Sequence, residues 1–225
     1  MLIPFKGKFL NFLGREESGY DKTVTDEIVL KEIFLENVYQ VFEGDILDTG
    51  IVIDLGANIG AFSIYMASMG AKVYGYEPEK ENFDMYKKNV EANGLSQIIS
   101  CNNSAVSNFT GTDELMGSQG AAFLSGAKPH INLPSQTVNT ITLASVFADN
   151  NIPYCDILKI DTEGSEYKIL DCDSDVINKA KYITMEFHAT DEITFGKMIA
   201  KLSLTHNTHI VGRFNYGGNI YAKRY

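Results

Sequence analysis

Ionisable residues that could act on a bound substrate stand at the ends of two apolar segments in the second half of the sequence. The segment C-D-I-L-K-I contains one lysine and is followed by an aspartate, and the segment Y-I-T-M-E-F is followed by a histidine. If both segments are parallel strands, their carboxyl ends lie at one edge of the sheet and these side chains converge there. Such a group suits proton transfer or metal binding. Its members are Lys159, Asp161, Glu163, Glu186 and His188.

An element that could position a ligand beside this group lies in the first third of the chain. Residues 51–60 read I-V-I-D-L-G-A-N-I-G, and an apolar run without polar alternation predicts a central parallel strand covered on both faces. Gly56 and Gly60 bracket Asn58 in a tight turn, and apolar residues at helical spacing follow from Ala61. Strand, glycine turn and helix together place backbone N–H groups where open α/β sheets bind their ligands.

The composition of the glycine turn excludes two common phosphate-binding loops. The dinucleotide fingerprint needs a glycine where Asn58 stands, and the phosphate loop needs lysine after Gly60, where Ala61 and Phe62 follow. The pattern that remains is D-x-G-x-N-x-G. Its Asp54 is able to hold an ammonium group or a water molecule near a cationic ligand. This pattern resembles motif I of class I S-adenosylmethionine-dependent methyltransferases.

An acid at the end of the next predicted strand fits the same cofactor. Glu77 and Pro78 follow the strand 72–76, roughly 20 residues after Asp54, which is the spacing of acids that bind ribose hydroxyls. A solvated glutamate at a generic strand end is the alternative. We therefore predict S-adenosylmethionine as cofactor and S-adenosylhomocysteine as product. The predicted cofactor-binding residues are Asp54, Gly56, Asn58, Gly60, Glu77, Pro78, Asn103, Ser104, Ala105 and Asp161, of which 103–105 are placed beside the adenine from topology alone.

Alternating strand and helix patterns predict one α/β domain over residues 1–225, with an N-terminal extension and leading helix in 1–45. The expected architecture is Rossmann-like, with a seven-stranded, mostly parallel sheet, an antiparallel edge hairpin and helices on both faces. The predicted strands are 51–55, 72–76, 98–102, 155–160, 182–187, 209–214 and 219–223, and the predicted helices are 26–39, 61–69, 79–93, 165–170 and 191–202.

Residues 107–140 differ in character from the segments around them. They are rich in Gly, Ser, Thr and Asn, contain Pro129 and Pro134, and show no helical period. This predicts a long irregular or hairpin insertion. Insertions of this kind often form walls or lids of substrate sites, so the segment is a candidate substrate lid. A mobile surface loop is the alternative, and the same choice applies to its His130.

Charge and cysteine content restrict the partners and the compartment. The net charge of −10 and pI of about 4.8 argue against a protein that relies on binding nucleic acid. The three cysteines are odd in number and widely spaced, which indicates neither a disulfide framework nor a zinc site. The sequence shows no signal-peptide pattern and no apolar run of membrane-spanning length. We expect a soluble cytoplasmic protein without a membrane partner, and its oligomeric state stays open.

Five motifs of the sequence occur together in this order: E-I-F-x-E-N-V-Y (32–39), I-D-L-G-A-N-I-G-A-F-S (53–63), Y-E-P-E (76–79), L-K-I-D-T-E-G-S-E (158–166) and M-E-F-H (185–188). Together they resemble the FkbM family of methyltransferases. The K-I-D-x-E-G-x-E pattern is the most telling of them, whereas the glycine turn is shared with many methyltransferases. The resemblance implies O-methyl transfer to a hydroxyl of a polyketide, sugar, glycan or other secondary metabolite, without naming the acceptor.

Methyl transfer to a hydroxyl requires alignment of the oxygen and a base or metal that favours the alkoxide. His188 is the natural base, since the ordinary pKa of histidine is about 6.5; a hydrogen-bonded histidine that caps the strand is the equal alternative. Lys159 either pairs with Glu186 or Asp161, which we favour, or helps to hold an anionic substrate. Glu163 and Glu186 complete the candidate catalytic set.

Three alternatives remain open at this point. A divalent metal held by the same acids and histidine is possible but not favoured, because the turn after Asp161 lacks the lysine of metal-dependent catechol-type enzymes. An RNA or tRNA methyltransferase would share the glycine turn, although the acidic charge disfavours it. A non-catalytic cofactor-binding module would keep the fold without the chemistry.

Overall fold

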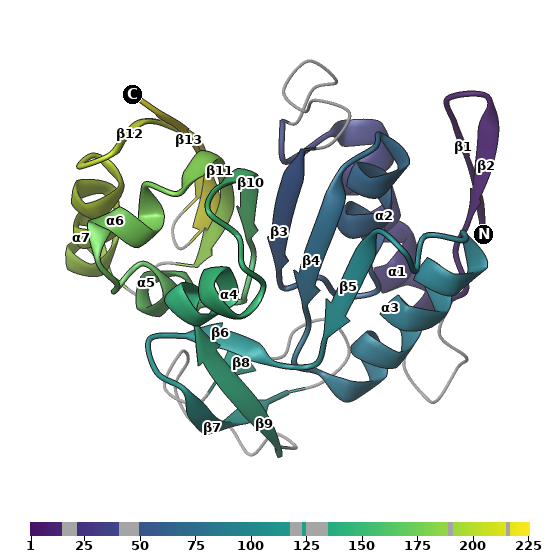
Figure 1. Cartoon of the computed structure of the whole chain (residues 1–225), viewed down its shortest axis with the longest axis horizontal. Coiled ribbons are helices and arrows are strands. Elements are labelled where there is room, and N and C mark those ends of the chain that lie inside the picture. Colours follow the sequence, from purple (N-terminus) through teal and green to yellow (C-terminus); the bar gives the residue numbers. More distant parts are fainter. Residues whose placement is uncertain (15–21, 41–49, 118–122, 125–134, 189–190, 215–216) are drawn as a thin grey trace.

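The computed structural model describes residues 1–14, 22–40, 50–117, 123–124, 135–188, 191–214 and 217–225. Its main sheet contains β3 (Ile51–Leu55), β4 (Lys72–Tyr76), β5 (Ile99–Asn102), β10 (Cys155–Ile160), β11 (Ala180–His188), β12 (His206–Phe214) and β13 (Gly217–Arg224). These seven strands lie in the order β12-β13-β11-β10-β3-β4-β5 (Figure 1). The neighbouring strands β5, β4, β3, β10 and β11 are parallel to one another, and β13 runs antiparallel to both β11 and β12. The predicted sheet, with its antiparallel edge, is confirmed.

The register of the central strands brings their carboxyl ends to one edge of the sheet. Leu55 lies opposite Tyr76 on β4 and opposite Ile160 on β10, and Ile160 lies opposite Met185 on β11. The residues that follow these positions therefore meet at the same edge. This edge is where sequence analysis placed the cofactor and the ionisable group.

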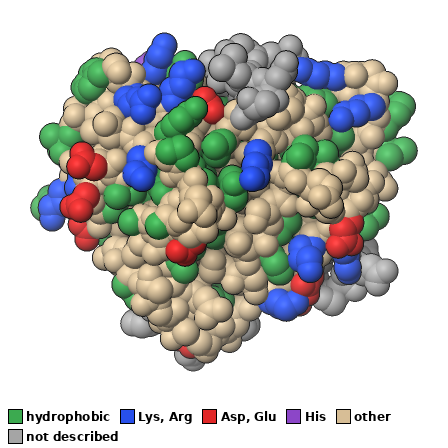
Figure 2. Space-filling model, in the orientation of Figure 1, with side chains coloured by type: hydrophobic (Ala, Val, Ile, Leu, Met, Phe, Trp, Pro, Cys, Tyr) green, Lys and Arg blue, Asp and Glu red, His purple; other side chains and the backbone are tan. Residues whose placement is uncertain are grey.

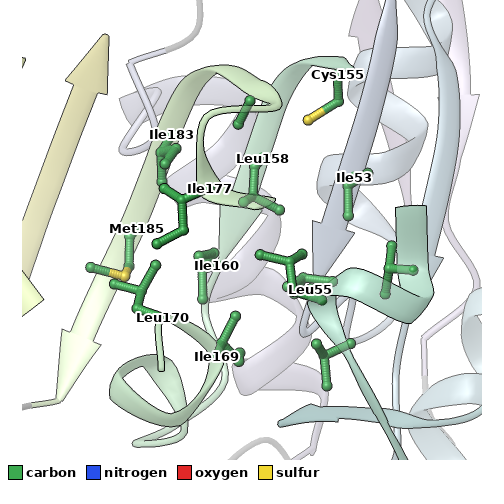
Figure 3. Packing of buried hydrophobic residues seen from close by; sticks show 14 of the residues in the cluster. Ile53, Leu55, Cys155, Leu158, Ile160, Ile169, Leu170, Ile177, Ile183 and Met185 are labelled. Carbon is green, nitrogen blue, oxygen red and sulfur yellow. The ribbon is translucent and has the colours of Figure 1, made fainter. Parts of the chain in front are cut away.

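Helices cover both faces of the sheet because neighbouring residues of each central strand point to opposite sides. Val52 packs with α1 (Lys22–Lys31), α2 (Ala61–Ser68) and α3 (Lys80–Ala92), whereas Ile53 packs with the helices on the other face. Figure 3 shows this second core, in which Ile183 of β11 lies near Ile177. The helices of the second face are α4 (Leu143–Asp149), α5 (Glu166–Ile169), α6 (Ser174–Ile177) and α7 (Glu192–Leu202).

The leading helix differs from the single helix predicted over 26–39. It consists of α1 followed by a π-helix, η1 (Glu32–Glu36), and it ends at Asn37, whose φ of 47° is left-handed. This turn redirects the chain onto the sheet, where the Thr184 hydroxyl donates to the Tyr39 carbonyl at 2.9 Å. A hairpin of β1 (Leu2–Phe5) and β2 (Lys8–Asn11), which sequence analysis missed, precedes it.

The predicted insertion is more regular than expected. Its strands β6 (Ala105–Ser107), β7 (Gly111–Met116), β8 (Phe123–Leu124) and β9 (Ser135–Thr142) form a second sheet, in the order β6-β9-β7-β8. The antiparallel pairing of β7 with β9 agrees with the predicted hairpin, whereas an irregular loop is wrong for the described part. Leu115 and Leu124 form a small buried core with Ala105 and Val138. His130 lies outside the described residues.

The glycine at the start of α2 provides a test of this packing. Gly60 has a φ of +86°, and a Cβ atom there would lie 2.1 Å from the Tyr86 ring. Gly60→Ala should therefore lower the free energy of unfolding by roughly 2–5 kcal/mol, through left-handed strain and overpacking. Gly94 is the matched control, since it has a φ of +67° and nothing within 4 Å of its added Cβ. Gly94→Ala should cost only about 1–2 kcal/mol in urea unfolding; equal losses would contradict the packing argument.

Candidate active site

The turn after β3 is held close to the turn after β10. Gly56 has a φ of +78°, and an added Cβ atom would lie 1.7 Å from the Asp161 carbonyl oxygen. Its N–H donates to the Tyr76 carbonyl at 3.0 Å, which joins it to the end of β4. Glycine is therefore required at position 56 because two backbone segments meet there.

Glu77 is a buried carboxylate at the floor of the resulting cleft. Its Oε2 accepts from the backbone N–H of Asn58 and its Oε1 from that of Glu79, each at 2.8 Å. Burial raises the pKa of Glu77 to about 7, although these two N–H groups act in the opposite direction. A carboxylate accepts about four hydrogen bonds. Glu77 thus keeps acceptor capacity for hydroxyl groups of a ligand.

The cleft contains most of the predicted cofactor-binding residues. Asp54, Gly60 and Asn103 are not in its wall; Gly60 packs against Tyr86, and the Asn103 amide donates to the carbonyls of Glu77 and Pro78. The lining consists of Gly56, Asn58, Tyr76, Glu77, Pro78, Asn82, Ser104, Ala105, Val106, Leu115, Leu124, Asp161, Thr162, Glu163 and Ser165.

The chemistry of the wall fits S-adenosylmethionine. Asn58 Oδ1 and Ser165 Oγ are buried and find no hydrogen-bond partner within the described part of the chain, so a polar ligand would satisfy them. Leu115 and Leu124 of the second sheet add an apolar portion suited to a flat base. The two leucines were not predicted, because the folding of the insertion against the cleft leaves no local pattern. Ser165 lies within the quoted motif 158–166 but was not predicted as a site residue.

Beneath the cleft, Lys159 carries a buried positive charge. Its Nζ lies 3.2 Å from Asp54 Oδ1 and 3.7 Å from Asp161 Oδ2, and it donates to the Gly56 carbonyl at 2.6 Å. Burial would lower the pKa of Lys159, but the two carboxylates raise it above its ordinary value. The pairing with Asp161 agrees with the prediction, whereas the partner that sequence analysis missed is Asp54 and no contact with Glu186 is seen.

Asp54 and Lys159 consequently have structural positions in this molecule. Asp54 has no exposed surface, and Lys159 is only 3% exposed. Asp54 Oδ2 also accepts from the Ser63 hydroxyl at 2.7 Å, so the ammonium group that this acid holds is that of Lys159. Asp54 therefore lies outside the wall of the cleft, and the ion pairs of Lys159 agree with the pairing that was favoured over a contact with an anionic substrate.

Tyr39 connects the leading helix to the same network. Its hydroxyl donates to Asp161 Oδ2 at 2.8 Å, and Lys159 Nζ lies 5.3 Å from the centre of its ring. Asp161 is thus held from two sides while it lines the cleft. The Y of E-I-F-x-E-N-V-Y was part of a recognised pattern, but nothing local indicated its partner.

His188 lies among carboxylates at the ends of β10 and β11. Its Nε2 is 3.6 Å from Glu163 and 3.8 Å from Glu186, and its Nδ1 is 3.5 Å from Glu166. Although burial lowers it, the pKa of His188 is raised to about 9, chiefly by the hydrogen bond and charge of Glu166. With this pKa the imidazole is mostly protonated at pH 7, whereas the predicted role as a base assumed a pKa near the ordinary value.

The pKa of the Glu186 carboxyl group is also raised, which makes this group a weaker acid than an ordinary glutamate. Burial, followed by the charge of Asp161, raises the pKa of Glu186 to about 7, while the side chain remains 45% exposed. It is thus accessible and ionises near neutral pH. Glu186 was predicted as part of the candidate catalytic set, but its raised pKa was not foreseen.

Within the described residues, no group of three or more His, Cys, Asp and Glu side chains is arranged to hold a metal ion. Those residues also include no helix with the length and apolar character needed to span a membrane.

The sheet order and the glycine-turn cleft define a class I methyltransferase. The chain superimposes on an rRNA methylase from Streptococcus thermophilus with a TM-score of 0.54 at 6% identity, over 85% of this chain and 95% of that one. A match at this identity shows the fold alone. The family model of the methyltransferase FkbM domain matches residues 54–211. The protein therefore belongs to the FkbM methyltransferase family, and its cofactor is S-adenosylmethionine.

Two curated relatives align with much of the chain. It is 23% identical to the hexuronic acid methyltransferase AglP of Haloferax volcanii, over 84% of this chain and 80% of AglP. It is 26% identical to the AMB antimetabolite synthetase AmbE of Pseudomonas aeruginosa, over 78% of this chain. The alignment spans only 10% of the length of AmbE.

The buried ion pair can be tested by removing its cation. Lys159→Met leaves Asp54 buried without its counter-ion, so it should lower the free energy of unfolding by about 3–5 kcal/mol in urea titrations. Lys80→Met is the control because Lys80 pairs with Asp84 on the surface of α3, and it should cost less than about 1 kcal/mol. Adding Asp54→Asn to Lys159→Met should recover part of the loss. Comparable losses in both lysine variants would contradict a structural pair.

Proposed function

We propose that this protein transfers a methyl group from S-adenosylmethionine to a hydroxyl oxygen of a small molecule or sugar. The observation that carries the proposal is the position of Glu163, which lines the cofactor cleft and lies 3.6 Å from His188. The cofactor cleft therefore adjoins a cluster of ionisable side chains. Membership of the FkbM family and the similarity to a hexuronic acid methyltransferase support an acceptor of this kind.

In this proposal different residues of the cleft bind different parts of the cofactor. When bound, the cofactor would supply a methyl group on a positively charged sulfur for transfer to a nucleophilic oxygen. Glu77 accepts hydrogen bonds from the ribose hydroxyls, while Asn58 and Ser165 satisfy polar groups of the amino-acid portion. Ser104, Ala105 and the leucines of the second sheet contact the base.

Glu186 is the proposed general base. With a pKa of about 7 it is ionised in roughly half of the molecules at neutral pH, and its side chain is accessible to an acceptor. Protonated His188 lies 3.8 Å from it and contributes a positive charge that favours the developing alkoxide. Glu163 helps to place the imidazole at the mouth of the cleft.

A small acceptor is favoured over nucleic acid on electrostatic grounds. The chain carries a net charge of −10. On the face shown in Figure 2, the described lysine and arginine side chains lie in several separate places, with acidic and apolar side chains between them. Nucleic-acid sites instead use continuous basic surfaces.

The three free cysteines agree with the proposed cytoplasmic location, where thiols stay reduced.

The proposed contact of Glu77 with the ribose hydroxyls should depend on pH. Because burial raises its pKa to about 7, the carboxylate that accepts ribose hydroxyls is depleted at pH 6 and dominant at pH 8. S-adenosylhomocysteine should therefore bind up to about tenfold more tightly at pH 8 in calorimetry. Glu77→Gln should weaken binding by about 1.5–3 kcal/mol and remove this pH dependence. Glu81→Gln, on the exposed side of α3, is the control and should change neither quantity. A pH dependence that survives in Glu77→Gln would exclude the assignment.

The role of Glu186 as general base can be tested by removing its charge. Glu186→Gln should lower turnover by about 10²-fold or more, while affinity for S-adenosylhomocysteine stays nearly unchanged. The wild-type rate should fall below pH 7, since the acceptor's proton requires ionised Glu186. This acid limb should persist in His188→Gln and disappear in Glu186→Gln. Product release is measured with a panel of monosaccharides, uronic acids, polyketide alcohols and matched amines. Turnover confined to the amines would refute transfer to oxygen, and an acid limb retained in Glu186→Gln would refute the base.

A further inference from the structure

Glu166, the first residue of α5, is a buried carboxylate with no role in the proposal above. Only 1% of its surface is exposed. Its Oε1 accepts from the backbone N–H of Thr162 at 3.0 Å, from the Thr162 hydroxyl at 3.1 Å and from the N–H of Gly164 at 2.9 Å. One oxygen atom thereby holds the whole turn that follows β10.

The same carboxylate also holds the end of β11. Its Oε2 accepts from the backbone N–H of His188 at 3.3 Å, and its Oε1 lies 3.5 Å from the imidazole Nδ1. The turn after β10 and the end of β11 are therefore joined through a single side chain. One segment supplies the wall of the cofactor cleft and the other supplies the histidine.

The conformation of the turn explains why it needs such support. Glu163 and Gly164 have φ values of +54° and +107°, which is an unfavourable conformation for glutamate. The N–H groups on either side of Glu163 both point at Glu166, so the carboxylate stabilises this conformation from within. Thr162, Glu163 and Ser165 line the cleft, and their positions follow from the turn.

The contacts of His188 show what the arrangement sets. Four carboxylates face the imidazole: Glu163 from the turn, Glu166 from α5, Glu186 from β11 itself and Asp161 from the end of β10. Glu166 is the one beside Nδ1, which leaves Nε2 directed at Glu163 and Glu186. The contact of Nδ1 with Glu166, an ion-pair distance of 3.5 Å, therefore sets which side of the ring faces Glu163 and Glu186.

We propose that Glu166 is a positioning residue, which locks the Thr162–Gly164 turn to the end of β11 and so orients His188 toward Glu163 and Glu186. It touches neither the cofactor nor the acceptor, and it acts through the turn and the imidazole. The proposal rests on the proposed function only in treating that cluster as the acceptor side of the site.

The first experiment follows the His188 imidazole by NMR, without any acceptor. The chain has four histidines, and His188→Gln assigns the relevant signal. In Glu166→Gln the amide oxygen still accepts from the turn, but the charge is lost. The midpoint of the His188 titration should fall by about one pH unit or more. Glu192→Gln, at the exposed start of α7, is the matched control and should leave it unchanged. An equal response in both variants would overturn the proposal.

The second experiment separates positioning from general stability. Glu166→Ala removes every acceptor of the turn, so it should weaken S-adenosylhomocysteine binding by about tenfold or more in calorimetry. Glu166→Gln should retain most of that affinity but lose about tenfold in kcat. If a folded Glu166→Ala protein binds S-adenosylhomocysteine as tightly as the wild type, Glu166 does not hold the Thr162–Gly164 turn in place and the proposal is refuted. If Glu166→Ala does not fold, the NMR titration of Glu166→Gln still decides. Because NMR and calorimetry need no acceptor, failure of the proposed O-methylation would leave both results interpretable.

Discussion

The buried ammonium group of Lys159 is the interaction on which the site edge of the sheet depends. A charge removed from water is tolerated only with close counter-ions and hydrogen bonds. Asp54 from β3 and Asp161 from β10 supply the counter-ions, and the Gly56 carbonyl supplies an acceptor. Satisfying one cation therefore draws the ends of two neighbouring strands together. It also brings Gly56 so close to Asp161 that a larger residue has no room.

Similar carboxylates acquire different properties around this centre because their surroundings differ. Burial raises the pKa values of Glu77 and Glu186 to about 7, whereas hydrogen bonds and the charge of His188 lower that of Glu166 despite its burial. Glu166 stays ionised and keeps His188 protonated, while Glu186 exchanges protons near neutrality. One sheet edge thus holds the ion pair of Glu166 and His188 beside a carboxyl group whose pKa is raised toward neutrality.

Local patterns predicted the parts of the molecule that are determined locally. Strand, glycine turn and helix at 51–68, and the acid after β4, follow from short-range hydrophobic periodicity and turn chemistry. The partner of Asp54, the hydroxyl contact of Tyr39 and the second sheet in 105–142 arise from pairings between distant segments. The raised pKa of His188 could not be predicted for the same reason, since it depends on carboxylates from several elements that meet only after folding.

The K-I-D-T-E-G-S-E segment acquires a physical interpretation from these contacts. Its lysine and aspartate belong to the buried network, its first glutamate adopts a left-handed conformation at the cleft, and its last glutamate holds the turn. Most of these requirements concern the construction of one turn at the wall of the cofactor cleft rather than recognition of a particular acceptor. A pattern of this kind identifies the family while leaving the acceptor unnamed.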